Sequence, residues 1–250
     1  IRIEIPADMD KSRMHSIRNH IAKAMEKLET EDFQLEELHI AGEKCAALRV
    51  PQIVITAAGE TDQKERIADA LLTARAGQDI VYAGWAGLEG MLRIIGEKEA
   101  ELRERFTPAF IGQMKAYDSE LCGLSKIAVA DAMGVSVIRQ VSRGGILASL
   151  WDLAKDTELG LNLDLKKIAV RQETIEVCEH FRLNPYQLAS GGSFLMLTEN
   201  GEALADALNQ KGIQAAVIGQ LTDSNDKIIH NGEDMRYIDR PAPDELMKVF

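Results

Sequence analysis

Three glycine-rich turns, each joined to a short apolar run, restrict the fold of this chain more than any other feature of its sequence. The first, Gly84–Gly90, follows the apolar run Ile80–Ala83, and the second, Ser142–Gly145, leads into apolar residues at helical spacing. The third, Ala189–Ser193, precedes the apolar run Phe194–Leu197. Because glycine tolerates backbone conformations and close approaches that other residues do not, these segments predict tight turns between helices and strands.

The hydrophobic pattern predicts helices and strands in irregular alternation. Strands are expected over 1–6, 50–58, 80–83, 135–138, 194–197 and, as the final strand, 215–218. Helical segments are expected over 12–28, 97–105, 123–133, 146–154, 173–180 and 201–210. Asp8 or Asp10 is placed to cap the first helix, and Gly134 to end the helix before it. This order predicts an α+β chain of layered sheets and helices rather than a regular doubly wound sheet.

The glycine spacing in Gly84–Gly90 is not that of a dinucleotide-binding fingerprint. It reads GxxGxxG, and no acidic residue closes a recognisable βαβ unit about 20 residues further on. We therefore expect a tight strand-to-helix turn here and no Rossmann cofactor site.

Composition and charge exclude several classes of function. The net charge is -11, and nonspecific nucleic-acid binding needs a basic surface, so no nucleic-acid partner is expected. No apolar run approaches the roughly 20 residues of a membrane span, and no segment is typical of a signal peptide. The sequence thus predicts a cytoplasmic protein without membrane contact.

Cysteine and histidine patterns provide no metal or disulfide framework. Cys45, Cys122 and Cys178 lie far apart and form no CxxC pair, which favours a reducing compartment. The five histidines form no HxH or HExxH motif, so a dedicated zinc site is not expected.

The turn Ser142–Gly145 has two interpretations. Exposed amides at a helix N-terminus favour an anion, and Arg143 would add a bidentate donor, which makes Ser142, Arg143, Gly144 and Gly145 candidate phosphate-binding residues. The paired glycines equally suit a structural turn approached by another part of the backbone. If the turn binds a ligand, we expect the following helix to face a cleft between the two portions of the chain.

Several segments, taken in order, resemble the AIR synthase (PurM-like) superfamily and most closely its hydrogenase-maturation branch, the HypE proteins. The six segments are 76–81, 84–90, 141–145, 183–188, 189–193 and 216–219. The resemblance implies a layered α/β/α C-terminal domain over 76–250 behind a partial PurM-like N-terminal domain over 1–75. It also supports a ligand-binding role for the turn that contains Gly191, Gly192 and Ser193.

The family uses ATP and magnesium, and this sequence departs from its pattern in the N-terminal portion. Ala41–Lys44, which includes the candidate phosphate-binding Gly42, stands where the family has a glycine-rich stretch similar to GGHTE. The family's upstream aspartate-bearing segments have no counterpart, and Asp8 and Asp10 are better explained as helix caps. We therefore expect weak MgATP binding by these 250 residues.

Two further departures concern the chemistry of HypE proteins. Their C-terminal cysteine has no counterpart in Glu245–Phe250, and HypE-like sequences often carry a glutamate at the position of Gly191. The same carbamoyl chemistry is consequently not expected from this chain in the same way.

These observations leave three functions open. The first is an ATP-dependent enzyme whose N-terminal ATP site is completed by further residues, and the second is a non-catalytic dimeric scaffold that binds a small anion or a maturation partner. The third, an AIR synthase itself, fits less well because the loops are HypE-like. Strands Ile1–Ile5 and Gln52–Thr56 would have exposed edges, so a homodimer through the N-terminal strands is expected.

Overall fold

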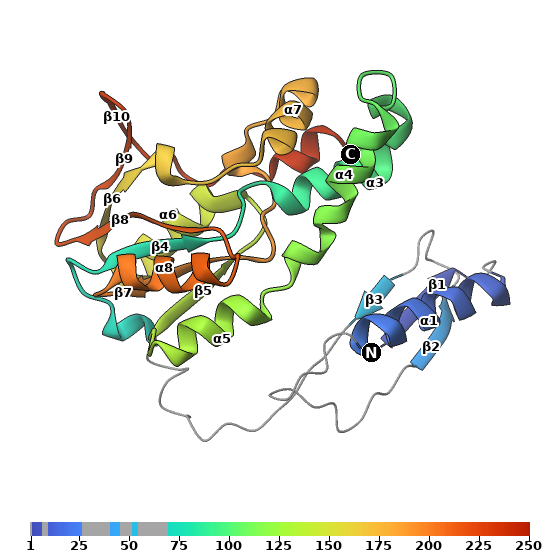
Figure 1. Cartoon of the computed structure of the whole chain (residues 1–250), viewed down its shortest axis with the longest axis horizontal. Coiled ribbons are helices and arrows are strands. Elements are labelled where there is room, and N and C mark those ends of the chain that lie inside the picture. The colour runs from blue at the N-terminus through green and yellow to red at the C-terminus, as the bar shows by residue number, and fades with distance from the viewer. Residues whose placement is uncertain (1, 7–9, 27–40, 46–51, 55–69) are drawn as a thin grey trace. The chain divides into compact units, whose positions relative to one another are not determined.

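The computed structural model describes residues 2–6, 10–26, 41–45, 52–54 and 70–250. The chain forms two compact units, Ile1–Asp62 and Gln63–Phe250. Each unit is described separately below, and Figure 1 shows their elements. None of the helices in the described part is both long and apolar enough to cross a membrane.

The described residues of the first unit form a three-stranded sheet and one helix. Strands β1 (Arg2–Pro6), β2 (Ala41–Cys45) and β3 (Gln52–Val54) lie in the order β2-β1-β3. Strand β1 pairs in parallel with β2 and antiparallel with β3, so it is the central strand. The sequence predicted an exposed edge at Ile1–Ile5, and this is wrong for the described residues of that segment. Strand β2, which was not predicted, pairs with the second side of β1.

Helix α1 (Lys11–Glu26) follows β1 and matches the predicted helix. The Asp10 Oδ1 atom accepts a hydrogen bond from the Arg13 backbone N–H at 2.7 Å, which satisfies one of the free amides of the first turn. Of the two predicted caps, Asp10 thus caps the helix, while Asp8 lies outside the described residues. So does the greater part of the predicted strand over 50–58.

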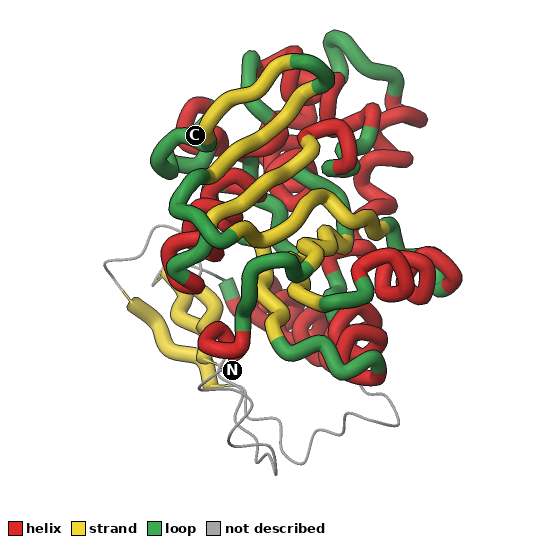
Figure 2. Tube along the Cα trace, turned by 90° about the vertical axis from the view of Figure 1, so that its left-hand side faces the viewer, coloured by secondary structure: helices red, strands yellow, loops and turns green. Residues whose placement is uncertain are grey.

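The second unit is built on a seven-stranded sheet. Its strands are β4 (Asp79–Ala83), β5 (Val137–Val141), β6 (Gly160–Asp164), β7 (Ser193–Thr198), β8 (Ala215–Thr222), β9 (Lys227–Asn231) and β10 (Asp234–Tyr237). They lie side by side in the order β10-β9-β6-β8-β4-β7-β5 (Figure 2). Neighbouring strands are antiparallel except β6 and β9. The sheet is therefore not doubly wound, which agrees with the prediction from the sequence.

Helices precede, connect and follow these strands. The α-helices are α3 (Leu88–Leu102), α4 (Pro108–Lys115), α5 (Leu124–Ala132), α6 (Gly145–Thr157), α7 (Gln172–Phe181) and α8 (Gly201–Gln210). Short 3-10 helices are η1 (Ala70–Thr73), η2 (Ala116–Leu121), η3 (Leu165–Lys167), η4 (Pro185–Gln187) and η5 (Glu245–Lys248).

Helices cover both faces of the sheet. Successive side chains of a strand point to opposite faces, so Ile80 and Tyr82 of β4 join the core that contains α6, whereas Val81 and Ala83 join the core formed with α5 and α8. These β4 residues are at most 1% exposed, which explains the unbroken apolar run in the sequence. The layered α/β/α arrangement expected for this portion is confirmed (Figure 1).

A third hydrophobic cluster joins helices α3, α4 and α7. Met91 and Ile94 of α3, Met114 of α4 and Val177 of α7 are fully buried in it. Burial and nearby Glu245 raise the pKa of Cys178, on the same face of α7, to about 12, so its thiol stays protonated at neutral pH. Cys178 is accordingly a packing residue.

The end of the chain departs from the sequence-based expectation. The strand predicted to end near Gly219 continues to Thr222, and β9 and β10 follow it, so the predicted final strand is not the last one. Strand β6 was also not predicted. All three additional strands are short, and β10 is exposed along its whole length, so the apolar pattern that identified the other strands is weak here.

Candidate functional site

The three glycine-rich turns meet at one edge of the seven-stranded sheet. The end of β4 at Ala83 lies opposite Phe194, at the start of the antiparallel β7. The end of β5 at Val141 lies opposite Ser193 in the same strand. The turns that follow β4 and β5 therefore converge on the turn that precedes β7, although they are far apart in the sequence.

Ser190 links the three turns. Its hydroxyl accepts a hydrogen bond from the Gly87 N–H at 2.7 Å and donates one to the Leu188 carbonyl at 2.8 Å. Its own N–H donates to the Ser142 carbonyl at 3.2 Å. Ser190 is fully buried, so these bonds replace water that it cannot reach.

Gly145 and Gly192 allow protein backbone to approach closely. Both have a positive φ, 66° and 83°. A Cβ atom on Gly145 would lie 2.4 Å from the Tyr186 carbonyl oxygen, and one on Gly192 would lie 2.5 Å from the Leu121 carbonyl oxygen. The structural interpretation of the paired glycines thus has a direct geometric cause.

Two of the turn amides donate hydrogen bonds to carboxylates of the chain itself. The Gly144 N–H donates to Asp244 Oδ2 at 2.7 Å, and the Gly191 N–H donates to Glu89 Oε2 at 2.8 Å. Asp244 therefore sits where the N-terminus of α6 would attract an external anion. A ligand that binds to either amide has to displace one of these carboxylates.

The structure places the remaining predicted site residues as follows. Ser142 and Arg143 are exposed, and the residue that caps α6 is Gly144, without a side-chain cap. Gly144 lines a cavity of about 230 Å³ together with Arg236, Asp239 and Arg240.

Ser193 is buried and its hydroxyl donates to the Ser190 carbonyl at 2.6 Å. Gly42 lies in β2, in the first unit, opposite Ile3. A ligand-binding role for all these residues stays a prediction.

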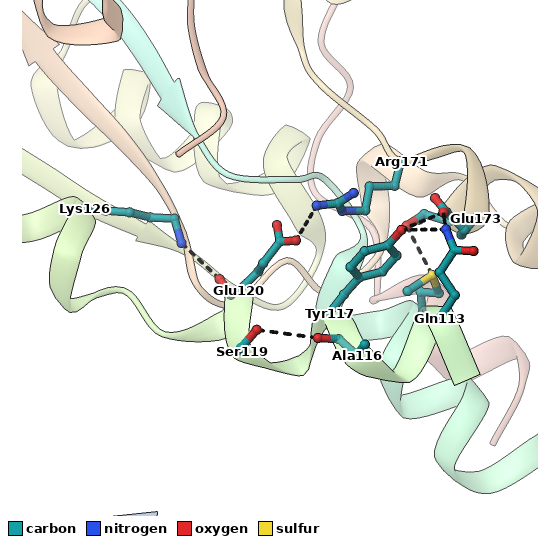
Figure 3. Close-up of polar contacts among 10 residues, drawn as sticks. Gln113, Ala116, Tyr117, Ser119, Glu120, Lys126, Arg171 and Glu173 are labelled. Atoms are coloured by element: carbon teal, nitrogen blue, oxygen red, sulfur yellow. Dashed lines mark hydrogen bonds and ion pairs between the residues drawn. The ribbon is translucent and has the colours of Figure 1, made fainter. Parts of the chain in front are cut away.

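A polar cluster that sequence reasoning missed lies beside these turns (Figure 3). Arg171 pairs through Nη2 with Glu120, and its guanidinium carbon lies 4.2 Å from the centre of the Trp85 ring and 3.9 Å from that of Tyr117. The Tyr117 hydroxyl donates to Glu173 at 2.7 Å, which fixes the ring. Cation–π contacts and the ion pair together hold the guanidinium in one place.

Lys126 lies on the other side of Glu120 in the same cluster. It is only 6% exposed, and its ammonium donates to the backbone carbonyls of Glu120 at 3.0 Å and Cys122 at 3.2 Å. Burial lowers the pKa of Lys126, while Cys122 and Glu120 oppose the shift. A lysine among the apolar positions of the predicted helix 123–133 was the only sequence signal for this residue.

Two other features of the described chain bear on ligand binding. No group of three or more His, Cys, Asp and Glu side chains among the described residues is arranged to hold a metal ion. A more open hollow of about 810 Å³ lies at the opposite end of β4, next to Asp79, and is lined by none of the predicted site residues.

Residues 75–231 match the family model of the AIR synthase related protein, C-terminal domain. The match covers more than half of the chain, so the chain belongs to this family. It includes the three glycine turns and the Arg171 cluster.

The curated relatives that the chain matches include hydrogenase formation proteins. A putative hydrogenase expression/formation protein of Methanocaldococcus jannaschii is 22% identical over 236 residues, which are 92% of this chain and 68% of that protein. Carbamoyl dehydratase HypE of Rhizobium leguminosarum bv. viciae is 26% identical over 153 residues, 59% of this chain and 41% of that protein. The match thus spans less than half of that HypE protein.

Solved HypE structures share the fold. E. coli HypE, described as a hydrogenase maturation protein, gives a TM-score of 0.71 at 16% identity and covers all of this chain and 75% of its own. HypE in a complex with HypF gives 0.66 at 17% identity, covering 96% and 76%, and HypE in complex with ATP gives 0.65 at 15%, covering 98% and 73%. The expected PurM-like, HypE-like fold is confirmed.

Proposed function

We propose that this chain acts in hydrogenase maturation as a HypE-like protein and that, by itself, it is a binding component rather than a complete ATP-dependent enzyme. The observation that carries the proposal is the match to a hydrogenase expression/formation protein along 92% of the chain. The predicted cytoplasmic location and the predicted division into domains 1–75 and 76–250 belong to this proposal.

The proposed partners are a second copy of the chain and a HypF-type maturation protein. Among the described residues, β2 and β3 are the edges of the small sheet, and unpaired strand edges favour pairing with another chain. A HypE protein with this fold has been solved in a complex with HypF. A ligand-binding role of the glycine turns is also part of the proposal, and the two arginines beside Gly144, Arg236 and Arg240, support it.

Sedimentation velocity tests the proposed assembly. We expect the chain alone to sediment as a dimer and to form a larger complex when the HypF-type protein of the same source is added at micromolar concentration. A monomer at high micromolar concentration would refute the dimer. Failure to form the larger complex, with a dimer present, would refute the role in hydrogenase maturation.

MgATP is expected to bind weakly to these 250 residues. Metal-bridged phosphates supply much of the affinity of such sites, and Ala41–Lys44 replaces the glycine-rich stretch that would approach them. A single charge-assisted hydrogen bond, for example from Arg143, contributes about 1.5–3 kcal/mol, which corresponds to no better than millimolar binding. Calorimetry should detect no saturable binding at low-micromolar MgATP, and Arg143→Ala should change little.

The opposite calorimetric result has a clear meaning. A micromolar dissociation constant that Arg143→Ala abolishes would show that the ATP site is complete within this chain. The enzyme alternative would then replace the binding role, and hydrogenase maturation would remain to be judged from the sedimentation experiment.

A further inference from the structure

A cavity of about 500 Å³ lies at the sheet edge where β4 ends and β8 begins. Its volume is within the range of sites for small molecules. Four segments form its walls: the turn after β4, the stretch from η2 into the first turn of α5, Arg171 before α7, and the stretch from the end of α8 to β8. The lining residues used in the argument are Trp85, Glu120, Cys122, Ser125, Lys126 and Arg171.

The Lys126 ammonium has donor capacity that the described chain does not use. An ammonium carries three N–H donors, and Lys126 makes two hydrogen bonds, both to the backbone carbonyls of the loop beside it. No carboxylate of the described residues forms an ion pair with it. The buried positive charge is therefore only partly compensated, which is costly unless a further acceptor is present.

Arg171 lines the same cavity, and its guanidinium is fixed in position by its neighbours. It makes one hydrogen bond, from Nη2 to Glu120, and its buried Nε has no acceptor among the described residues. Trp85 and Tyr117 fix the plane of the guanidinium without using its N–H groups. Apart from the enclosed Nε, the guanidinium has N–H donors at Nη1 and Nη2 that form no hydrogen bond with the described residues, and this rigid fork suits an oxyanion.

The charge balance of the cavity favours an anion. Lys126 and Arg171 are its cations and Glu120 is the only carboxylate in its lining, so the lining carries one excess positive charge. The whole chain, in contrast, has a net charge of -11. A purely structural role, in which Lys126 holds the end of η2 and Arg171 holds Glu120, explains the contacts that are made but not the surplus of donors and charge.

We propose that this cavity binds a small metabolite through a carboxylate or phosphate group held between Lys126 and Arg171. The metabolite's remaining atoms contact Trp85 and Ser125 in the cavity wall. The site is separate from the amides of Gly144 and Gly191, and the proposal does not depend on the role in hydrogenase maturation.

Tryptophan fluorescence provides a direct test, because the chain has only two tryptophans, Trp85 and Trp151. In a Trp151→Phe background, Trp85 alone reports on the cavity. Sulfate, inorganic phosphate and acetate are titrated at constant ionic strength, with chloride as the balancing anion. We expect a saturable change in Trp85 emission with millimolar affinity, as bare ions with a few hydrogen bonds provide. Tighter binding of phosphate than of acetate identifies a phosphate ligand, and the reverse a carboxylate.

Two variants and a matched control locate the site. Lys126→Gln and Arg171→Gln are each expected to weaken sulfate binding on the order of tenfold, since each removes a charge-assisted hydrogen bond. Lys155→Gln removes an exposed lysine near the end of α6, outside this cavity, and should change the affinity less than about twofold. Circular dichroism and the melting temperature verify that each variant is folded.

The pH dependence tests Lys126 without a substitution. Sulfate keeps its charge between pH 7 and 10, whereas Lys126, which faces Cys122 and Glu120, loses its proton at a lower pH than an ordinary lysine. Affinity should be present at pH 7 and fall as the pH rises through the lowered pKa. The proposal is overturned if no anion produces a saturable change up to about 100 mM, or if both variants bind sulfate as tightly as the parent.

Discussion

Gly145→Ala is expected to lower the free energy of unfolding by about 3 kcal/mol or more. An alanine at φ 66° is strained, and its Cβ would lie 2.4 Å from the Tyr186 carbonyl oxygen and 2.8 Å from that of Leu188. Both neighbours are backbone atoms, so relief requires η4 and α6 to move apart. Urea unfolding followed by circular dichroism measures the loss.

Gly134→Ala is the matched control for this prediction. Gly134 has φ 70°, close to that of Gly145, but no atom lies within 4 Å of the position that a Cβ would take. Its substitution should cost only the backbone strain, about 1 kcal/mol. Equal losses for the two variants would mean that the close backbone approach at Gly145 contributes nothing.

Ser190→Ala should destabilise the chain by about 2–3 kcal/mol, because a buried donor without a partner costs about 1–3 kcal/mol. The substitution leaves the Gly87 N–H without its acceptor and the Leu188 carbonyl without the Ser190 hydroxyl. Thermal and urea unfolding measure the effect, and reduced order at the start of α3, where the Gly87 N–H loses its acceptor, should appear as faster amide exchange.

Ser193→Ala separates this role from ordinary burial of a serine. Ser193 is also buried, and its hydroxyl donates to the Ser190 carbonyl, which accepts the Ser193 N–H as well. Its loss should cost about 1 kcal/mol or less. If Ser193→Ala were the more harmful variant, Ser190 would not be the link between the turns.

Local sequence pattern predicted the parts of the fold that local chemistry determines. The apolar run of β4 and the helical spacing after Gly145 identified buried elements, and Gly134, with φ 70°, ends α5 as expected. Strands β6 and β9 were missed because each has only two apolar residues among its five, too few for the apolar pattern to identify a strand.

The site was predictable only in part. The sequence identified the glycines as places of close approach. It could not show that the groups that approach them are the Tyr186 and Leu121 carbonyls. Nor could the sequence show that Asp244 reaches the amide of Gly144. Lys126 lies in α5 and Arg171 directly before α7, and the two share no sequence motif. Only the folded chain brings them to one cavity.

A crystal structure of the chain grown with phosphate and without ATP tests the account most directly. It predicts a phosphate ion within hydrogen-bond distance of Lys126 Nζ and the Arg171 guanidinium. An empty cavity between Lys126 and Arg171 would contradict it, whether or not phosphate displaces Asp244 from the Gly144 amide.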